Sequence, residues 1–125
     1  MLTGREMNSL VSTILPLMPR SLVYCDVGAR WGIGDPWKSF EALLGLLRFE
    51  PDEEEYASLM RKKGRNDVIL QYALYREARN IFLNVTKSRG CSSLYEPNFE
   101  FLNHYADVKR FEIERVADIR ATALD

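Results

Sequence analysis

The feature that most restricts the fold is a nearly continuous apolar run from Leu22 to Val27 that ends directly on Gly28. A run of this kind, rich in β-branched and aromatic residues, is typical of a strand covered on both faces at the centre of a parallel sheet. Short apolar segments follow at Leu46–Glu50 and Val68–Leu74, with helical patterns between the strands. We therefore expect an α/β fold built on parallel strands with right-handed crossovers.

Helix-end patterns support this order. Asp35 and Pro36 predict an N-cap and a first-turn proline for the helix after the first strand. Asp52, followed three residues later by Glu55, has the spacing of a capping box for the next helix, and Gly64 is expected to close that helix at its C′ position. The series strand, helix, strand, helix, strand predicts a Rossmann-like partial parallel sheet with flanking helices.

The pattern changes after Tyr75. Apolar residues alternate at Ile81–Val85 and again at Phe111–Val116, which predicts an added antiparallel strand pair of half-exposed strands. A loop rich in Gly, Ser and Pro lies between them, and residues 99–105 are expected to form a helical turn. For the four aromatic residues near that turn we favour a local core over an acceptor pocket or subunit contact; they are Tyr95, Phe99, Phe101 and Tyr105.

The chain is divided into two parts by these patterns. Residues 1–20 are expected to form a leading amphipathic helix and a linker, because Met7, Leu10, Val11 and Ile14 fall on one helical face before the prolines that stop it. Residues 21–125 are expected to form the N-terminal, cofactor-binding half of a Rossmann-like domain, truncated before the later strands. The uncovered sheet edges of such a half favour a homo-oligomer.

Composition excludes several partner classes. Seventeen Lys and Arg against eighteen Asp and Glu give a formal net charge of -1, so no overall field favours nucleic acid or an anionic membrane. No apolar run approaches the roughly 20 residues of a membrane helix, and no secretory signal is evident. Cys25, expected in a buried strand, and Cys91, expected in a loop, form neither a disulfide framework nor a metal set, which favours reduced thiols in the cytoplasm.

The candidate site is the turn after the first strand, Asp26-Val27-Gly28-Ala29-Arg30-Trp31-Gly32, where open α/β sheets bind ligands. Gly28 and Gly32 allow a sharp turn and a close approach to a ligand. Glu50, at the end of the second strand, can accept hydrogen bonds from both hydroxyls of a ribose. The combination predicts a nucleoside ligand, against the alternative of a plain turn and a solvated strand end.

Dinucleotide binding is the nearest competing interpretation, and it expects G-x-G-x-x-G in this turn. Position 30 is Arg rather than Gly. In the shifted frame Gly32-Ile33-Gly34, the bulky Trp37 stands where the last small residue should be. NAD is therefore disfavoured.

The chain resembles the FkbM-type methyltransferases from about Val23 to Asp125. The resemblance rests on an ordered series: Asp-Val-Gly-Ala-Arg-Trp-Gly from Asp26, Phe49-Glu50-Pro51-Asp52, Tyr72-Ala73-Leu74 and Ser92-Ser93-Leu94. It implies S-adenosylmethionine as cofactor, with Asp26, Gly28, Ala29 and Gly32 around its methionine part and Glu50 and Pro51 at its ribose. It also implies methyl transfer to a hydroxyl of a small-molecule acceptor such as a sugar or natural product.

The sequence departs from that family in two places. Family members continue into a fourth strand with another acidic motif, and Tyr75-Arg76-Glu77 replaces a short Ser-Asp turn. No catalytic base can be named: His104 is interpreted as a surface or packing residue, and Ser92 and Ser93 as loop hydrogen-bonding residues. The alternative function is a noncatalytic module that binds a nucleoside or associates with itself.

Overall fold

The computed structural model describes residues 13, 22–35 and 37–124. The chain consists of two compact units, Met1–Gln71 and Tyr72–Asp125. The predicted leading helix at residues 7–14 lies outside the described residues except for Thr13, which is helical and exposed. No helix in the described ranges is long and apolar enough to cross a membrane.

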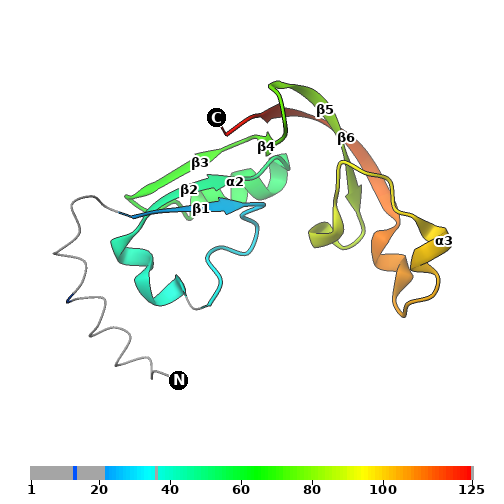
Figure 1. The fold of residues 1–125 in the computed structure, drawn as a ribbon, viewed down its shortest axis with the longest axis horizontal. Helices are drawn as coiled ribbons and strands as arrows, with labels where there is room; N and C mark the ends of the chain where they lie inside the picture. Colours follow the sequence, from blue (N-terminus) through cyan, green and yellow to red (C-terminus); the bar gives the residue numbers. More distant parts are fainter. Residues whose placement is uncertain (1–12, 14–21, 36, 125) are drawn as a thin grey trace. The chain divides into compact units, whose positions relative to one another are not determined.

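The first unit contains a three-stranded parallel sheet in the order β1-β2-β3 (Figure 1). The strands are β1 (Val23–Val27), β2 (Gly45–Phe49) and β3 (Asp67–Leu70). The predicted parallel strands and their order along the chain are confirmed. The first strand is not central, however: β1 lies at one edge and β2 is in the middle. Within the described part of the chain, no strand pairs with the outer edge of β1.

Helical segments follow β1 and β2. The segment after β1 is a 3-10 helix, η2 (Trp37–Leu43), rather than the predicted α-helix. The segment after β2 is the α-helix α2 (Glu53–Arg61), whose N-cap is Asp52 as predicted. Its C-cap is Lys62, so Gly64 lies beyond the C′ position, and the prediction that Gly64 closes the helix is wrong. The N–H of Gly64 instead donates to Asp67 Oδ2 at 3.1 Å.

Both helical segments pack on the same face of this sheet. Leu59 of α2 packs with Ile69 and Ala29, and Phe40 of η2 packs against a cluster that contains Leu46. Leu46 and Ile69 point to one side of their strands. We call this side the helix-covered face; Tyr24, Asp26 and Arg48 point to it as well.

The opposite side of the sheet, which we call the open face, carries Val23, Cys25, Val27, Leu47 and Val68. Val23 is 65% exposed, Val27 59% and Val68 52%, and Cys25 is also exposed. Phe49, near the carboxyl end of the same side, is buried. The prediction that the first strand and Cys25 are covered on both faces is therefore wrong. The helices after β1 and β2 lie on one side only.

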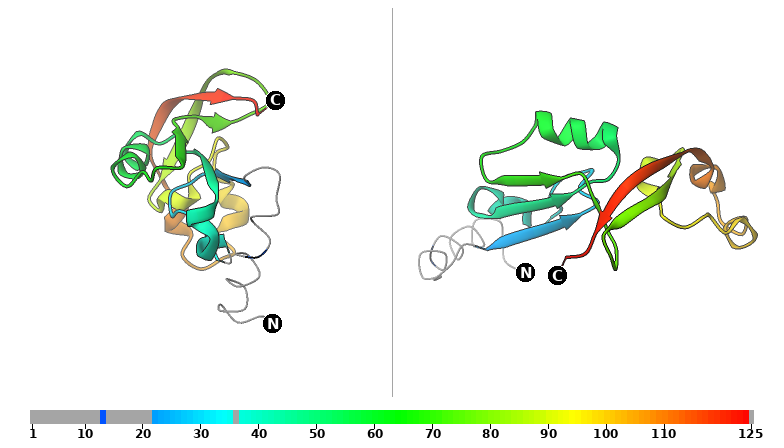
Figure 2. Two further views of the ribbon diagram at one scale, coloured as in Figure 1. Left: turned by 90° about the vertical axis from the view of Figure 1, so that its left-hand side faces the viewer. Right: turned by 90° about the horizontal axis from the view of Figure 1, so that it is seen from above.

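The second unit is built on a mixed sheet in the order β4-β6-β5, comprising β4 (Ala73–Leu74), β5 (Arg79–Thr86) and β6 (Ile113–Thr122). β5 and β6 are antiparallel, which confirms the added strand pair, and β4 pairs with β6 in parallel. The core contains Leu83, Val85 and Ile119. Figure 2 shows the two long strands running side by side.

Two predicted strands have different bounds. The segment Val68–Leu74 is divided between β3 in the first sheet and β4 in the second, because the backbone of residues 73–75 pairs with the end of β6. Phe111 belongs to the 3-10 helix η4 (Val108–Phe111), and β6 begins only at Ile113.

The loop between β5 and β6 contains short helical segments, η3 (Arg89–Cys91) and α3 (Phe99–Leu102), the second of which confirms the predicted helical turn. Asn98 caps α3, its side chain accepting from the N–H of Phe101 at 3.2 Å. The aromatic residues here do not form the predicted local core. Tyr95 is 77% exposed, Phe101 56% and Tyr105 58%, although the last two rings contact each other.

Candidate functional site

The turn after β1 is joined to the end of β2 by its backbone. The N–H groups of Gly28 and Ala29 both donate to the carbonyl of Phe49, at 2.9 and 3.2 Å. Gly28 has φ of 74° and Gly32 has φ of 75°, a conformation that strongly favours glycine. A Cβ at either glycine would meet no atom within 4 Å. The turn thus presents backbone without side-chain cover beside the carboxyl ends of β1 and β2.

Glu50 follows β2 directly and is 4% exposed. Its N–H donates to the carbonyl of Leu70 at 3.1 Å, and its Oε1 accepts from the N–H of Asp52 at 3.0 Å. Burial raises the pKa of Glu50, while the Asp52 N–H and the nearby Arg30 act to lower it. The carboxylate is therefore held by the backbone that leads into α2.

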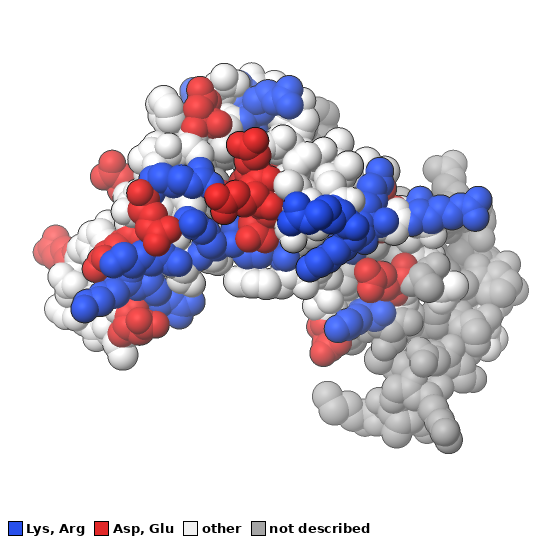
Figure 3. Space-filling model, turned by 180° about the vertical axis from the view of Figure 1, so that it is seen from behind, with Lys and Arg blue, Asp and Glu red and all other residues white. Residues whose placement is uncertain are grey.

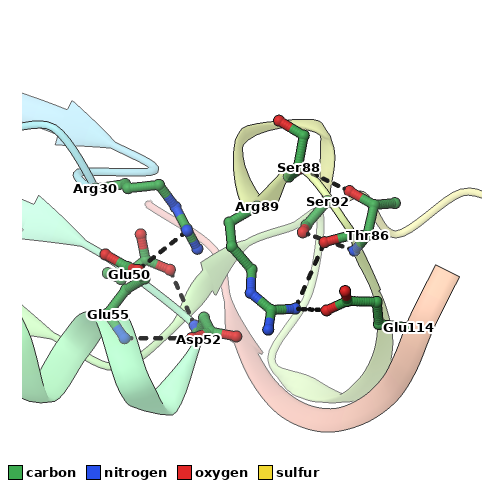
Figure 4. Close-up of polar contacts among 9 residues, drawn as sticks. All are labelled: Arg30, Glu50, Asp52, Glu55, Thr86, Ser88, Arg89, Ser92 and Glu114. Carbon is green, nitrogen blue, oxygen red and sulfur yellow. Dashed lines mark hydrogen bonds and ion pairs between the residues drawn. The ribbon is translucent and has the colours of Figure 1, made fainter. Parts of the chain in front are cut away.

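The predicted capping box is formed only in part. Asp52 Oδ1 accepts from the N–H of Glu55 at 3.2 Å, as predicted. In a full capping box the Glu55 side chain would accept from the N–H of Asp52. Here Glu50 Oε1 accepts from that N–H instead, and Glu55 Oε1 lies 3.1 Å from Arg30 Nη1. In Figure 4 the Arg30 side chain extends from the turn after β1 toward Glu50 and Glu55. Arg30 is thus a site residue that the sequence interpretation missed.

Asp26 lies within β1 opposite Arg48 of β2 in the parallel register. Its Oδ2 is buried and has no hydrogen-bond partner among the residues that the structure describes. Burial raises the pKa of Asp26, and the positive charge of Arg48 acts to lower it. A buried carboxylate oxygen without a donor is an acceptor available to a ligand group that carries N–H or O–H.

The other predicted site residues lie nearby in the chain but differ in role. Ala29 is 1% exposed and packs with Leu59 and Ile69, so its side chain belongs to the core. The N–H of Gly32 donates to the carbonyl of Ala29 at 3.1 Å, which closes the turn. Pro51 is half-buried between Glu50 and Asp52.

A cavity of about 400 Å³ lies on the helix-covered face of the first unit. Of the six predicted site residues only Gly32 lines it, and the lining also includes Arg30 and Trp31 of the same turn and residues of η2, β2, α2 and the start of β3. Arg48 on its wall is buried and lies 3.2 Å from Glu41 and 3.8 Å from Asp67. Two carboxylates thus lie near its guanidinium, whereas its Nε is buried and has no hydrogen-bond partner among the described residues. The cavity shares Arg30 and Gly32 with the candidate site, so the two adjoin at the turn after β1.

Polar residues of the second unit have structural roles. Ser92 Oγ accepts from the N–H of Thr86 at 3.2 Å, and Thr86 Oγ1 donates to the carbonyl of Ser88 at 2.7 Å. Arg89 lies 2.9 Å from Glu114 (Figure 4). These contacts agree with the interpretation of Ser92 as a loop hydrogen-bonding residue, and His104 is exposed.

Charge does not mark a further site on the face that Figure 3 draws, and metal ligands mark none among the described residues. Figure 3 shows basic and acidic side chains interleaved across the face that it draws. Over residues 13, 22–35 and 37–124, no group of three or more His, Cys, Asp or Glu side chains is arranged to hold a metal ion.

Comparison with known proteins adds no relative. No protein-family model matches the chain, and no curated protein or solved structure matches it.

Proposed function

We propose that this chain belongs to a Rossmann-like methyltransferase domain that binds S-adenosylmethionine and transfers its methyl group to a hydroxyl oxygen of a small-molecule acceptor. The observation that carries the proposal is the position of Glu50 beside an open glycine turn. Both lie at the carboxyl ends of neighbouring parallel strands, where α/β sheets bind nucleosides. The FkbM-type resemblance supplies the choice of cofactor and acceptor.

The residues at these strand ends fit different parts of such a cofactor. Asp26 Oδ2, buried and without a donor, suits the ammonium group of the methionine part. Gly28 and Gly32 leave open backbone around which that part can lie. Glu50, as a carboxylate, accepts hydrogen bonds from the ribose hydroxyls. The bound cofactor supplies a sulfonium methyl group, and the chain's contribution is to hold it in line with the acceptor oxygen.

Arg30 lies near Glu50 and is therefore close to the proposed ribose position. Glu50 is 4% exposed, and Arg30 contributes to the electrostatic environment of its carboxylate while pairing with Glu55. The side chains of this pair are only 12% and 28% exposed, so breaking it costs more than breaking a surface ion pair.

Titration calorimetry tests the cofactor assignment. Wild-type protein should bind S-adenosylmethionine more tightly than NAD. Glu50→Gln should weaken the binding at least tenfold, because the amide retains one acceptor oxygen but loses the negative charge. Glu53→Gln is the matched control, since Glu53 is exposed on the first turn of α2 and should not alter affinity. Absence of S-adenosylmethionine binding would refute the assignment, and unchanged affinity in Glu50→Gln would refute the ribose role.

The second candidate function is a noncatalytic module that binds a nucleoside or associates with itself. The unpaired outer edge of β1, in the described part of the chain, favours self-association, because an open edge is a template for another strand. Sedimentation over a concentration series separates the two: a dimer that binds no cofactor would favour the module over the methyltransferase.

A further inference from the structure

The open face of the first sheet is apolar, and no helix or strand of the described part of the first unit covers it. Val23, Val27 and Val68 are more than half exposed there, and Cys25 lies between the first two. Parallel sheets are covered on both faces in almost all known proteins. Covering such side chains contributes about 25 cal/mol for each square ångström of apolar surface removed from water. The face therefore has a strong tendency to acquire a partner.

We propose that the partner is the chain's own N-terminal segment, residues 1–21, which docks on the open face as an amphipathic helix. The segment joins the sheet at the start of β1, the strand that carries Val23, Cys25 and Val27. A tethered segment is present at an effective concentration in the millimolar range. This advantage favours it over a second copy at micromolar concentration.

The residue pattern of the segment fits this face. Met7, Leu10, Val11 and Ile14 form one apolar stripe, and Ser9 and Ser12 lie on the opposite side of a helix. Thr13, the described residue of this segment, is helical and its side chain is exposed, which agrees with a position outside the stripe.

The lengths also fit. An eight-residue helix is about 12 Å long at 1.5 Å per residue, which approaches the roughly 17 Å of a five-residue strand. Residues 15–21 can span up to about 23 Å when extended. That reach is sufficient for the helix to return antiparallel to β1 and lie over it.

Disulfide trapping tests the docked position, because Cys25 is a natural thiol at the middle of β1. The background is Cys91→Ser, which leaves Cys25 as the only cysteine and retains an acceptor for Arg110. Leu10→Cys places a thiol in the apolar stripe, and Ser9→Cys is the control with almost the same tether length. Under copper-phenanthroline oxidation, the Leu10→Cys protein should form an intramolecular disulfide at least ten times faster than the control. Peptide mass analysis identifies the bond.

Three results would overturn the proposal. Equal rates for the two variants would mean that the tether alone brings the thiols together. Disulfides between two chains would assign the face to a second copy. If neither the Leu10→Cys protein nor the Ser9→Cys protein forms a disulfide with Cys25, the segment does not occupy the face.

The reactivity of Cys25 gives a second test that needs no engineered thiol pair. In the Cys91→Ser protein, docking should slow modification of Cys25 by a charged thiol reagent at least tenfold relative to Val11→Asp, which places a charge in the stripe. Circular dichroism establishes that both proteins are folded. Equal modification rates in two folded proteins would refute docking.

Discussion

Substitution of the turn glycines tests the backbone geometry of the site. Gly28 has φ of 74°, and a methyl group there would contact nothing within 4 Å. In the folded state, Gly28→Ala therefore adds backbone strain alone, about 1–2 kcal/mol for an L-residue in the left-handed region. Gly34 also has open space around it but lies outside that region. Gly34→Ala should be neutral or stabilising by about 0.4–1 kcal/mol through the unfolded chain.

The comparison of the two variants isolates the strain, because both restrict the unfolded chain equally. The difference of about 1–2 kcal/mol corresponds to roughly a five- to thirty-fold change in the folding equilibrium. Urea unfolding followed by tryptophan fluorescence is a suitable assay. The chain has two tryptophans, Trp31 and Trp37, and both belong to the first unit, so the signal reports that unit specifically.

A small difference would refute the assigned backbone conformation. If Gly28→Ala and Gly34→Ala have unfolding free energies within 0.3 kcal/mol of each other, the turn does not hold Gly28 in the left-handed region. Gly28→Asn provides a further check, because asparagine tolerates this conformation better than alanine. It should recover part of the loss. A Gly28→Asn protein less stable than Gly28→Ala would contradict the same reasoning.

Three other substitutions test separate contacts. Glu50→Gln should become more stable relative to wild type as pH rises above 4.5, the ordinary pKa of glutamate. Burial raises the pKa of Glu50 in the folded protein, so wild type loses stability as this carboxyl group ionises, whereas glutamine does not ionise. A loss of stability of Glu50→Gln relative to wild type in urea titrations at rising pH would contradict this. Asp52→Ala should cost about 1 kcal/mol by removing the N-cap of α2, measured by tryptophan fluorescence; no loss would mean that the cap is dispensable. Val85→Ala should cost about 2 kcal/mol in circular dichroism melts, because Val85 is 0% exposed, whereas Val116→Ala, at a 58% exposed position, should cost little.

The parallel sheet could be predicted from local patterns alone. Leu46–Phe49 and Val68–Leu70 are short apolar runs between helix-end residues, and these signals act over a few residues. The N-cap at Asp52 was predictable for the same reason. The division of Val68–Leu74 into two strands was not predictable, because it depends on pairing with β6, about fifty residues later in the chain.

The candidate site was predictable in position but not in its contacts. Glycines after an apolar strand and an acid after the next one marked the two strand ends. The second glycine position of the dinucleotide pattern drew attention to Arg30 only because a glycine is missing there. Its pairing with Glu55 depends on the packing of α2 and has no signature in local spacing. Similarly, the exposure of Tyr95 and Phe101 depends on how the loop lies, which composition does not determine.

The hydrogen bond from the Asp52 N–H to Glu50 has a thermodynamic consequence for the proposed site. The same carboxylate that would accept the ribose hydroxyls also fixes the backbone at the entrance to α2. A ligand that draws this carboxylate away must compete with the helix start, and such coupling is reciprocal. A substitution that stabilises the first turn of α2 in the free protein but not in the complex will weaken ligand binding, and one that destabilises this turn will strengthen binding. The affinity changes by the factor by which the substitution shifts the stability of the turn between the two states. The helix start is therefore a point from which affinity can be tuned without contact with the ligand.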